Sequence, residues 1–292
     1  MFRFSILIPT YNRLQKLQSV LHALSMQEGV GEGEVIVGVD GSEDGTEEWL
    51  GGEGWKGSKG NKGNNEIRNL SWFRIENSGR AVIRNRLLER AKGEIVIFIQ
   101  DDIVVTEGWL QAHLAAHELF TGAVIGHVTW YPQMEVTPYM RWLEQGGHLL
   151  DFGSLRDGQE TDFWHFYMGN ISIDRGLLEG LRFDETSPTY GWEDIVFGYE
   201  FVRRGGRVSY CEAALAYHWD DYREEDLETY MMKVAESAVW AEERYPGLGF
   251  VPSLWKKAVF RTIILSSRPV WRWLPQELRW YVSMKKYFLK SI

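Results

Sequence analysis

The chain has little cysteine and no long apolar run. Its single cysteine, Cys211, cannot form a disulfide within the chain. No stretch reaches the roughly 18–20 apolar residues of a membrane-spanning helix. The apolar part of the opening MFRFSILIPTYN is too short for the hydrophobic region of a signal peptide. These absences favour a reducing, cytoplasmic setting, with Cys211 as a buried structural thiol in a predicted strand.

An excess of positive charge is also missing. The net charge of −9 is opposite in sign to that of a general nucleic-acid-binding protein, so no nucleic-acid partner is expected. The charge is unevenly distributed, because residues 253–292 hold nine Lys or Arg and one Glu. This segment therefore carries about +8 and residues 1–252 about −17. What the chain has in quantity is hydrophobic residues, 44% of the total, which can fill a sizeable core.

Strand-like and helix-like segments alternate through the chain. Apolar, β-branched runs predict strands at 4–9, 34–39, 71–75, 94–99, 123–130 and 207–217. Helical periodicity predicts helices at 14–24, 46–50, 80–91, 106–120 and 224–244, and Thr106 is the expected cap of the fourth. Two more helices are expected to begin at Arg175 and at Trp255. Residues 51–65, rich in Gly, Lys and Asn, and residues 131–165 are predicted to be loops. This alternation predicts an α/β fold with a mostly parallel, doubly wound sheet.

Polar clusters follow four of the predicted strands: Thr10-Tyr11-Asn12, Asp40-Gly41-Ser42, Asp101-Asp102 and His218. In an open parallel sheet, ligands gather beyond the carboxyl ends of the strands, so these clusters predict a site. Each has a plainer explanation as well. Asp40 could be a turn residue, Asp101 and Asp102 could cap the following helix, and His218 could pack between its aromatic neighbours.

Two adjacent carboxylates at the end of an apolar strand favour a cation site, because desolvated carboxylates repel unless a cation neutralises them. Oxygen ligands select Mg²⁺ or Mn²⁺, and an imidazole such as that of His218 tilts the choice toward Mn²⁺. His113 and His117 lie four apart but lack the Glu of an H-E-x-x-H motif. They are expected to face solvent.

A second acidic pair, Glu193-Asp194, follows Gly191-Trp192 and begins an amphipathic helix. The two acids could simply favour the positive end of that helix. Alternatively, an aromatic face beside a carboxylate suits a polyhydroxylated ligand. The residues alone leave both explanations open.

With these residues in view, the chain resembles the family 2 inverting glycosyltransferases of the GT-A fold. The resemblance rests on FSILIPTYNR, EVIVGVDGSEDGT, NSGRAVIRNRLLERAKGEIVIFIQDDI and MGNISIDRGLLEGLRFDETSPTYGWEDIVFGYEFVRRGG, in order between residues 4 and 218. The last block also resembles the C-terminal segment of β-1,4-galactosyltransferases and chondroitin-polymerase-like enzymes. A GT-A fold implies a Rossmann-like, mostly parallel mixed sheet flanked by helices, here with a C-terminal helical extension. The implied division is a nucleotide-sugar-binding half at 1–105, an acceptor-binding and catalytic half at 106–222, and a basic, aromatic helical extension at 223–292.

The resemblance implies metal-dependent transfer of a hexosyl unit, with inversion, from a nucleotide-diphospho-sugar to a hydroxyl of a glycan or lipid-linked saccharide, in polysaccharide biosynthesis. A UDP-sugar is the expected donor. Gln100-Asp101-Asp102 stands in place of the family's D-x-D, so that Asp102 and His218 are the implied ligands of Mn²⁺ or Mg²⁺. The other implied donor contacts are Thr10 and Tyr11 at the base pocket, Asp40 at the base, Arg80 and Arg84 near the diphosphate, and Asp101 at the ribose or sugar.

On the acceptor side, the resemblance implies that Asp194 is the general base. Trp192 and Glu193 are expected to orient the acceptor, with Gly169 and Asn170 beside them closing around the donor sugar. Two rival functions are a non-catalytic nucleotide-sugar- or glycan-binding module and a nucleotidyltransferase. The second would ordinarily carry a Gly-rich, basic loop where this chain has Pro9-Thr10-Tyr11-Asn12-Arg13.

The basic tail interleaves cations with rings. Trp255, Trp271, Trp273, Trp280 and Tyr281 alternate with Lys and Arg in residues 253–292. This composition suits helices that lie in a membrane interface, so a peripheral position on the inner face of a membrane is one expectation. The other is a helical appendage packed on the catalytic body or on a second subunit.

Overall fold

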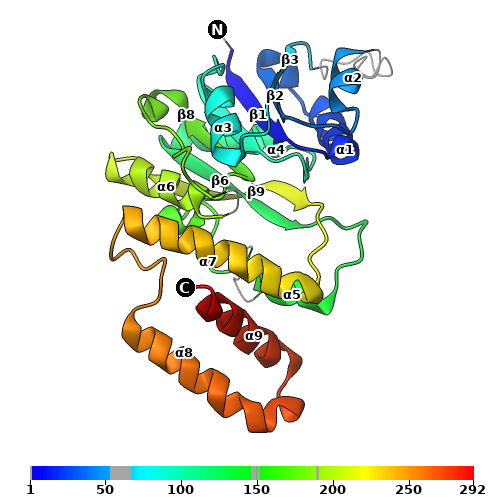
Figure 1. The fold of residues 1–292 in the computed structure, drawn as a ribbon. Helices are drawn as coiled ribbons and strands as arrows, with labels where there is room; N and C mark the ends of the chain where they lie inside the picture. The colour runs from blue at the N-terminus through cyan, green and yellow to red at the C-terminus, as the bar shows by residue number, and fades with distance from the viewer. Residues whose placement is uncertain (1, 53–66, 146–148, 150–151, 189–190) are drawn as a thin grey trace.

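Nine strands among the described residues form one mixed sheet, which is the body of the protein (Figure 1). The computed structural model describes residues 2–52, 67–145, 149, 152–188 and 191–292. The strand order is β3-β2-β1-β4-β8-β6-β9-β5, with β7 paired to β9. The strands are β1 (Phe4–Thr10), β2 (Glu34–Asp40), β3 (Leu70–Ile75), β4 (Ile95–Ile99), β5 (Ile103–Val105), β6 (Ala123–Trp130), β7 (Glu160–Thr161), β8 (Asn170–Asp174) and β9 (Val208–His218).

The predicted parallel arrangement holds for β3, β2, β1 and β4, which pair in parallel throughout. Beyond β4 the directions change, because β8 runs antiparallel to both β4 and β6. β9 is again parallel to β6, while β5 and β7 pair antiparallel to β9. The sheet is therefore parallel on the N-terminal side and mixed on the other.

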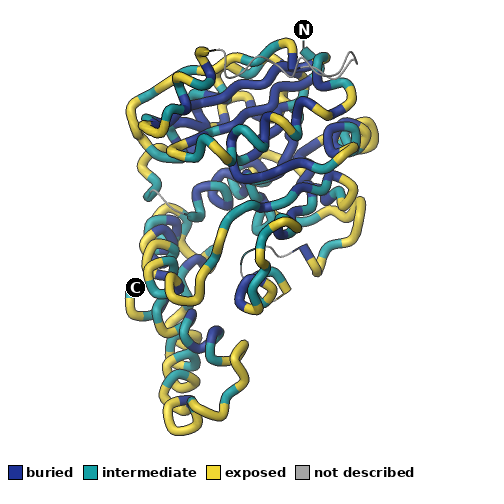
Figure 2. The backbone as a smooth tube through the Cα atoms, turned by 90° about the vertical axis from the view of Figure 1, so that its right-hand side faces the viewer, coloured by how far each residue is buried: buried dark blue, intermediate teal, exposed yellow. Residues whose placement is uncertain are grey.

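Helices cover the sheet and bury the apolar faces that the sequence predicts. In α1 (Leu14–Ser25), the residues Leu17, Val20, Leu21 and Leu24 are fully buried. α3 (Arg80–Leu88) packs on β1 and β2, and α4 (Trp109–Leu119) packs on β6 and β9. Figure 2 shows the strands as the most deeply buried part of the chain. Cys211 lies in a strand, β9, as predicted, but it is only partly buried, and this burial raises the pKa of its thiol.

Several predicted elements are wrong. The helix expected from Arg175 is only the short 3₁₀ turn Arg175–Leu178, and α6 (Glu193–Arg203) follows later. The region expected to be loops contains α5 (Pro138–Gln145). Thr106 does not cap α4, because its hydroxyl donates to the carbonyl of Leu215 and Gly108 precedes the helix. Most of the predicted loop at 51–65 lies outside the described residues, beyond α2 (Thr46–Gly51).

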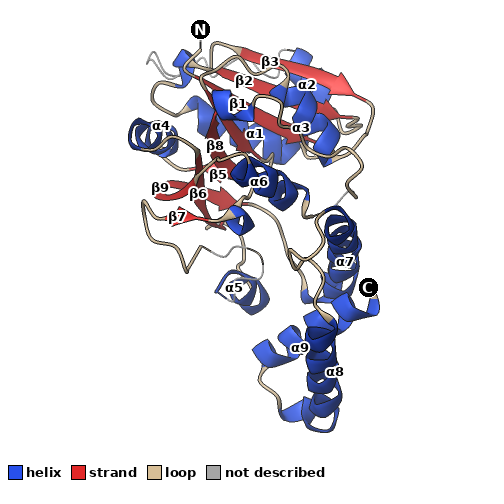
Figure 3. Ribbon diagram, turned by 90° about the vertical axis from the view of Figure 1, so that its left-hand side faces the viewer, coloured by secondary structure: helices blue, strands red, loops and turns tan. Residues whose placement is uncertain are grey.

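The C-terminal part is helical, as predicted. α7 (Leu227–Arg244) packs on α9 (Gln276–Lys290), and α8 (Leu254–Ser267) lies beside α9 (Figure 3). Trp130, Met140, Ile195, Met231 and Trp280 form part of a second core beneath these helices. Within α8 only Ser267 is buried, so this helix is largely exposed.

None of the helices in the described part of the chain is both long and apolar enough to cross a membrane.

Candidate active site

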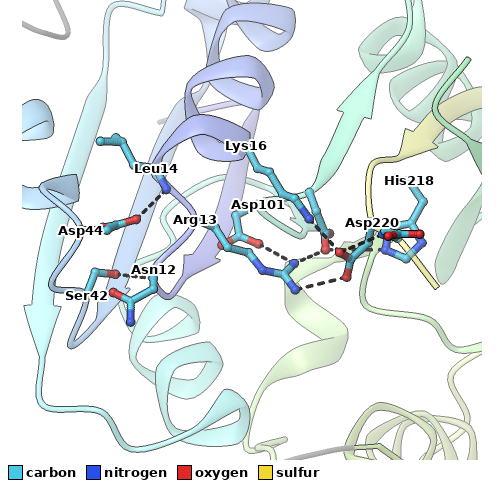
Figure 4. A network of polar contacts seen from close by, with 11 residues as sticks. Asn12, Arg13, Leu14, Lys16, Ser42, Asp44, Asp101, His218 and Asp220 are labelled. Atoms are coloured by element: carbon cyan, nitrogen blue, oxygen red, sulfur yellow. Dashed lines mark hydrogen bonds and ion pairs between the residues drawn. The ribbon is translucent and has the colours of Figure 1, made fainter. Parts of the chain in front are cut away.

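The loops after β1 and β2 are tied together at one edge of the sheet. The backbone N–H of Asn12 donates to the Ser42 hydroxyl at 3.0 Å (Figure 4). The Asn12 side-chain oxygen accepts from the N–H of Glu43 at 2.7 Å. Asn12 itself adopts a positive φ of 51°. These bonds hold the predicted base-binding loop in one conformation, with Thr10 buried and Tyr11 49% exposed.

Asp40, at the end of β2, binds the backbone that starts α3. Its two carboxylate oxygens accept from the N–H groups of Ser78 at 2.8 Å and Gly79 at 3.0 Å. Gly41 follows with a φ of 74°, and a Cβ there would lie 2.7 Å from the nitrogen of Asn77. Asp40 therefore positions a loop as well as ending a strand, which is more than a simple turn residue does. Its predicted contact with the base stays a prediction.

Asp101 and Asp102 meet a cation that belongs to the chain itself. Arg13, in the loop after β1, bonds to Asp102 and lies 3.5 Å from Asp101 and 3.2 Å from Asp220. Lys16 reaches the other oxygen of Asp220 at 2.8 Å. Arg13 thus places a positive charge beside the two buried carboxylates, and Lys16 places one beside Asp220 (Figure 4). The predicted divalent ion at Asp101 and Asp102 stays a prediction.

His218 joins the same cluster from the end of β9. Its Nε2 lies 3.6 Å from a carboxylate oxygen of Asp102. The imidazole is stacked on Trp130, with ring centres 5.6 Å apart, and Tyr222 meets it edge-on at 5.7 Å. The ring is therefore held in a fixed orientation between two aromatic side chains.

Asp102, His218 and Asp220 together have the chemistry of a divalent-metal site. One ligand atom from each lies within 4.8 Å of the others. The buried Oδ1 of Asp102 and Nδ1 of His218 have no hydrogen-bond partner among the described residues, which is costly unless a ligand satisfies them. Two carboxylates and an imidazole suit Mn²⁺ or Mg²⁺, so these residues fit the implied ion.

The pair Asp101 and Asp102 titrates unequally. Burial and the neighbouring charge of Asp102 raise the pKa of Asp101 to about 7, despite the opposing effect of Arg13. Burial also acts to raise the pKa of Asp102, but His218 and Arg13 outweigh it and hold that pKa well below its usual range. Asp102 is thus the ionised member of the pair, as a metal ligand must be.

Glu193 and Asp194 begin α6 and differ in their surroundings. Glu193 forms an ion pair of 2.8 Å with Arg84, and both side chains are at most 3% exposed. Asp194 is partly exposed, and one of its oxygens accepts from the N–H of Ile195. Burial and the charge of Glu193 raise the pKa of Asp194 to about 6, with Arg84 acting in the opposite direction.

Arg84 and Glu193 both border the cavity described below, where they form this ion pair. The second oxygen of Glu193, Oε2, has no hydrogen-bond partner among the described residues. The predicted contacts of Arg84 with a diphosphate and of Glu193 with an acceptor stay predictions. Removing either partner would leave a buried charge unpaired, so the pair also supports the start of α6.

Asn170 is also occupied within the protein. Its amide nitrogen donates to the carbonyls of His127 and Ala214, and its amide oxygen accepts from Trp109 Nε1 and lies 2.9 Å from His113 Nε2. With 1% of its surface exposed, Asn170 has no polar group left for a sugar. The predicted contact is therefore corrected to a structural role, whereas Gly169 does border the cavity described below.

The prediction that His113 and His117 face solvent is wrong. His113 is fully buried, and only 3% of the His117 side chain is exposed. Both rings lie within hydrogen-bond distance of the Ser172 hydroxyl, at 2.8 and 2.9 Å. The two histidines therefore lie on the face of α4 that is turned toward β8, and the Ser172 hydroxyl of β8 contacts both rings.

A cavity of about 680 Å³ connects the two acidic clusters. One part of the cavity is lined by Asp102, His218 and Asp220, and another part is lined by Trp192 and Asp194. Arg80 and Gly169 also border it. Trp192 has a positive φ of 64°, and its indole N–H donates to the carbonyl of Val234 at 3.0 Å, so the ring is fixed in the cavity wall.

Sequence comparison matches residues 5–181 to the model of glycosyl transferase family 2. Among curated proteins, the chain is 28% identical to the uncharacterized glycosyltransferase YfnE of Bacillus subtilis (strain 168) over 69% of this chain and 60% of that protein. It is 24% identical to chondroitin synthase of Escherichia coli over 73% of this chain and 34% of that enzyme. The chain thus spans less than two thirds of the length of either relative.

Solved structures show the same fold at low identity. The mannosyltransferase PcManGT from Pyrobaculum calidifontis, in complex with GDP-Man and Mn²⁺, superposes with a TM-score of 0.62 at 17% identity, over 99% of this chain and 85% of that one. Residues 1–349 of S. aureus TarS, in complex with UDP-GlcNAc, give 0.56 at 17% identity, over 99% and 90%. The mixed sheet with its flanking helices is therefore a GT-A fold with a C-terminal helical region. Because the family match at residues 5–181 covers more than half of the chain, the chain belongs to glycosyl transferase family 2.

Proposed function

We propose that the protein is a metal-dependent, inverting hexosyltransferase that moves a sugar from a nucleotide-diphospho-sugar to a hydroxyl acceptor. One observation carries this proposal. The cluster of Asp102, His218 and Asp220 opens onto the same cavity as Asp194, a carboxyl group with a raised pKa. A metal-binding set and a separate base in one cavity are what a single displacement needs.

Asp194 is the proposed general base. Its carboxylate accepts the proton of the acceptor hydroxyl while that oxygen forms a bond to the anomeric carbon. The bond from that carbon to the diphosphate oxygen breaks on the opposite side, so the configuration inverts. A pKa of about 6 leaves Asp194 ionised at neutral pH yet more basic than an ordinary aspartate. Trp192 offers a ring face on which the acceptor sugar stacks.

Asp102, His218 and Asp220 would hold Mn²⁺ or Mg²⁺. When bound, such an ion acts as a Lewis acid that stabilises the negative charge growing on the departing diphosphate. Arg13 now lies against these carboxylates, and its guanidinium is long enough to turn toward a phosphate once they are otherwise neutralised. Arg80, which borders the same cavity, is the second proposed phosphate contact.

The proposed donor is a UDP-sugar. Thr10 and Tyr11 sit beside the loop that Asn12 and Ser42 hold in place, where a base can lie. TarS is in complex with UDP-GlcNAc, whereas PcManGT is in complex with GDP-Man. The test therefore compares uridine and guanosine nucleotides. The assignment to polysaccharide biosynthesis follows the similarity to chondroitin synthase.

A donor panel tests this function directly. Thermal unfolding is measured with UDP, GDP, UDP-GlcNAc and GDP-Man, each with and without Mn²⁺, because a ligand of the native state raises the apparent stability. We expect UDP compounds to raise the melting temperature only when Mn²⁺ is present. Without an acceptor, the protein should hydrolyse the donor slowly. The NMR signal of the anomeric proton should show that the sugar is first released with inverted configuration. If none of these nucleotides raises the melting temperature in the presence of Mn²⁺, the proposal is wrong.

We also propose that the C-terminal helices rest on an anionic membrane surface. Leu254, Trp255 and Leu265 are 86%, 74% and 57% exposed, and at about 100° per residue they fall on one arc of α8. Lys257 and Arg261 border this arc, which is the pattern of an interfacial helix. Trp280 does not belong to it, since it is 3% exposed and packs on the rings of α5.

Vesicle co-sedimentation tests the membrane proposal. The protein should sediment with phosphatidylglycerol vesicles and much less with phosphatidylcholine vesicles. The double variant Leu254→Ser, Leu265→Ser should lose most of this binding. Leu119→Ser, which changes a 92% exposed leucine on α4, is the control and should bind as the unchanged protein does. Equal binding by both variants would contradict the proposal.

A further inference from the structure

The cavity that holds Asp194 does not end at the sheet. It continues between the C-terminal helices, where its walls become apolar. The walls there include Met231 and Val234 of α7, Phe250, Phe260 of α8, and Met284 and Phe288 of α9. We call this part, defined by these six residues, the helical groove. An acceptor sugar alone has no use for such a surface, because sugars present mainly hydroxyl groups.

Two lysines border the helical groove. Lys285 of α9 and Lys256 of α8 both line the cavity. The ammonium group of Lys285 lies 5.2 Å from the ring centre of Phe260 and 5.1 Å from that of Tyr281. Burial lowers the pKa of Lys285, and no carboxylate in the described part of the chain forms an ion pair with it. A partly desolvated cation in this position gains from an anionic ligand.

We propose that the helical groove binds the hydrocarbon chain of the acceptor, which is a saccharide carried on a long-chain alkyl or prenyl phosphate. The chain lies between α7, α8 and α9, the phosphate meets Lys285 and Lys256, and the sugar reaches Trp192 and Asp194. This inference rests on the proposed glycosyltransferase function and narrows its acceptor to one chemical class.

Three features of the groove favour this occupant. Its walls are apolar, its border is cationic, and it is continuous with the cavity around Asp194. These features match, in the same order, a hydrocarbon chain, a phosphate and a sugar. The surrounding segment carries about +8.

Binding of dodecyl phosphate tests the groove, measured by isothermal titration calorimetry below its micelle concentration. Dodecyl maltoside, which lacks the phosphate, and inorganic phosphate, which lacks the chain, are the comparison ligands. We expect one dodecyl phosphate per chain and at least about tenfold weaker binding of either comparison ligand. Octyl and decyl phosphates should bind progressively less, since each buried methylene strengthens binding by up to about fourfold.

Matched variants separate the groove from general surface attraction. Lys285→Met should weaken dodecyl phosphate binding about tenfold, whereas Lys286→Met, one residue away and exposed, should leave it unchanged. Phe260→Ser should weaken it several-fold, whereas Leu265→Ser, on the exposed side of the same helix, should not. Circular dichroism and melting temperature check that each variant is folded.

Each outcome decides the proposal. Equal losses from both lysine variants, or no binding of dodecyl phosphate, would overturn it. A dimer that dissociates when dodecyl phosphate is added would assign the groove to a second copy of the chain instead. The UDP and Mn²⁺ thermal shift is recorded on the same preparation. If that shift is present and dodecyl phosphate does not bind, only the groove inference fails. If dodecyl phosphate binds but no nucleotide does, the transferase function fails, and with it the assignment of the ligand as an acceptor.

Discussion

The two acidic clusters of the cavity differ in how their cation is held. On the proposed donor side, the Arg13 side chain is 33% exposed and lies against Asp102, which is 2% exposed. On the proposed acceptor side, Arg84 and Glu193 are 2% and 3% exposed and form an ion pair. An exposed cation can be exchanged for another, whereas a buried one cannot leave without a large cost. The donor-side carboxylates can therefore serve as a binding site, while the Arg84–Glu193 pair is part of the framework.

Each cluster also keeps one carboxyl group with a raised pKa. That group is Asp101 on the donor side, at about 7, and Asp194 on the acceptor side, at about 6. Burial is the main cause in both, and the neighbouring acid is the second. Each pair thus contains a carboxyl group that is more basic than an ordinary acidic side chain. The clusters differ in where that group lies. Asp194 borders the cavity together with Glu193, whereas Asp102, the member of the other pair with the lowered pKa, is the one that borders the cavity there.

The largest expected effect comes from removing the base. Asp194→Asn should lower turnover by about 10²–10⁴-fold, because general base catalysis contributes that much, while UDP binding with Mn²⁺ is retained. Steady-state kinetics and the thermal shift measure the two quantities. Glu200→Gln, on the same helix and paired with Arg203 at the surface, is the matched control and should keep its activity. Full activity of Asp194→Asn would remove this residue from the mechanism.

The next effect tests the ion pair of Arg84 and Glu193. Arg84→Met should lower the free energy of unfolding by about 3–5 kcal/mol, because it leaves Glu193 charged and buried without a partner. Urea denaturation measures this change. Arg86→Met, on the same helix but with a 39% exposed side chain, should cost less than about 1 kcal/mol.

Changing both partners sharpens that test. The double variant Arg84→Met, Glu193→Met should recover most of the lost stability, because no buried charge remains. If instead the double variant is as unstable as the single one, packing rather than charge explains the loss.

Asp220 tests the exchangeable cluster. Asp220→Asn should weaken Mn²⁺ binding by about 10- to 100-fold, since changes even to the outer partners of a metal site have effects of this size. Calorimetric titration with Mn²⁺ alone gives the affinity without any activity assay. Asp221→Asn changes the adjacent acid, which pairs with Arg223 and is 52% exposed, and should leave the affinity as it was.

The pH dependence follows from Asp194. Because only the ionised carboxylate can accept a proton, kcat/KM should be constant above a pH of about 6 and fall about tenfold for each unit below it. The raised pKa places this limb about two units above that of an ordinary aspartate. The residual activity of Asp194→Asn should lack the limb. A profile that stays flat down to pH 4 would contradict the assignment.

The smallest effect has the opposite sign. Arg13→Gln should strengthen Mn²⁺ binding by about three- to tenfold, because the ion no longer competes with a guanidinium for Asp102 and Asp220. Arg74→Gln, which breaks a surface pair with Glu47, is the control. Weaker Mn²⁺ binding by Arg13→Gln would mean that Arg13 arranges the carboxylates rather than competing for them.

Much of the donor side could be predicted from the sequence because it depends on local pattern. Asp40, Asp101 and His218 each end an apolar strand, and parallel strands place such ends at one edge. The alternation of strands and helices likewise allowed the parallel, N-terminal half of the sheet to be predicted. β8 escaped prediction because a strand that reverses direction within a sheet carries no local mark of its partners.

The missed contacts all join distant parts of the chain. Asp220 reaches Asp102 only because β9 pairs with β5, and Arg84 reaches Glu193 across 109 positions. One signal was available, since Trp219-Asp220-Asp221 repeats after β9 the acidic pair that precedes β5. For Asn170 there was no such signal, because its role depends on a helix and two strands that meet around one amide.

The stacking of His218 between Trp130 and Tyr222 has a consequence for the whole cavity. Trp130 belongs to the core that α7 and α9 also pack on, so the imidazole shares its packing with the walls of the helical groove. If a ligand at each end tightens this shared core, the two ligands strengthen each other's binding by the same factor. Filling either end of the cavity would then prepare the other, and the order in which the substrates arrive would not matter to the final affinity.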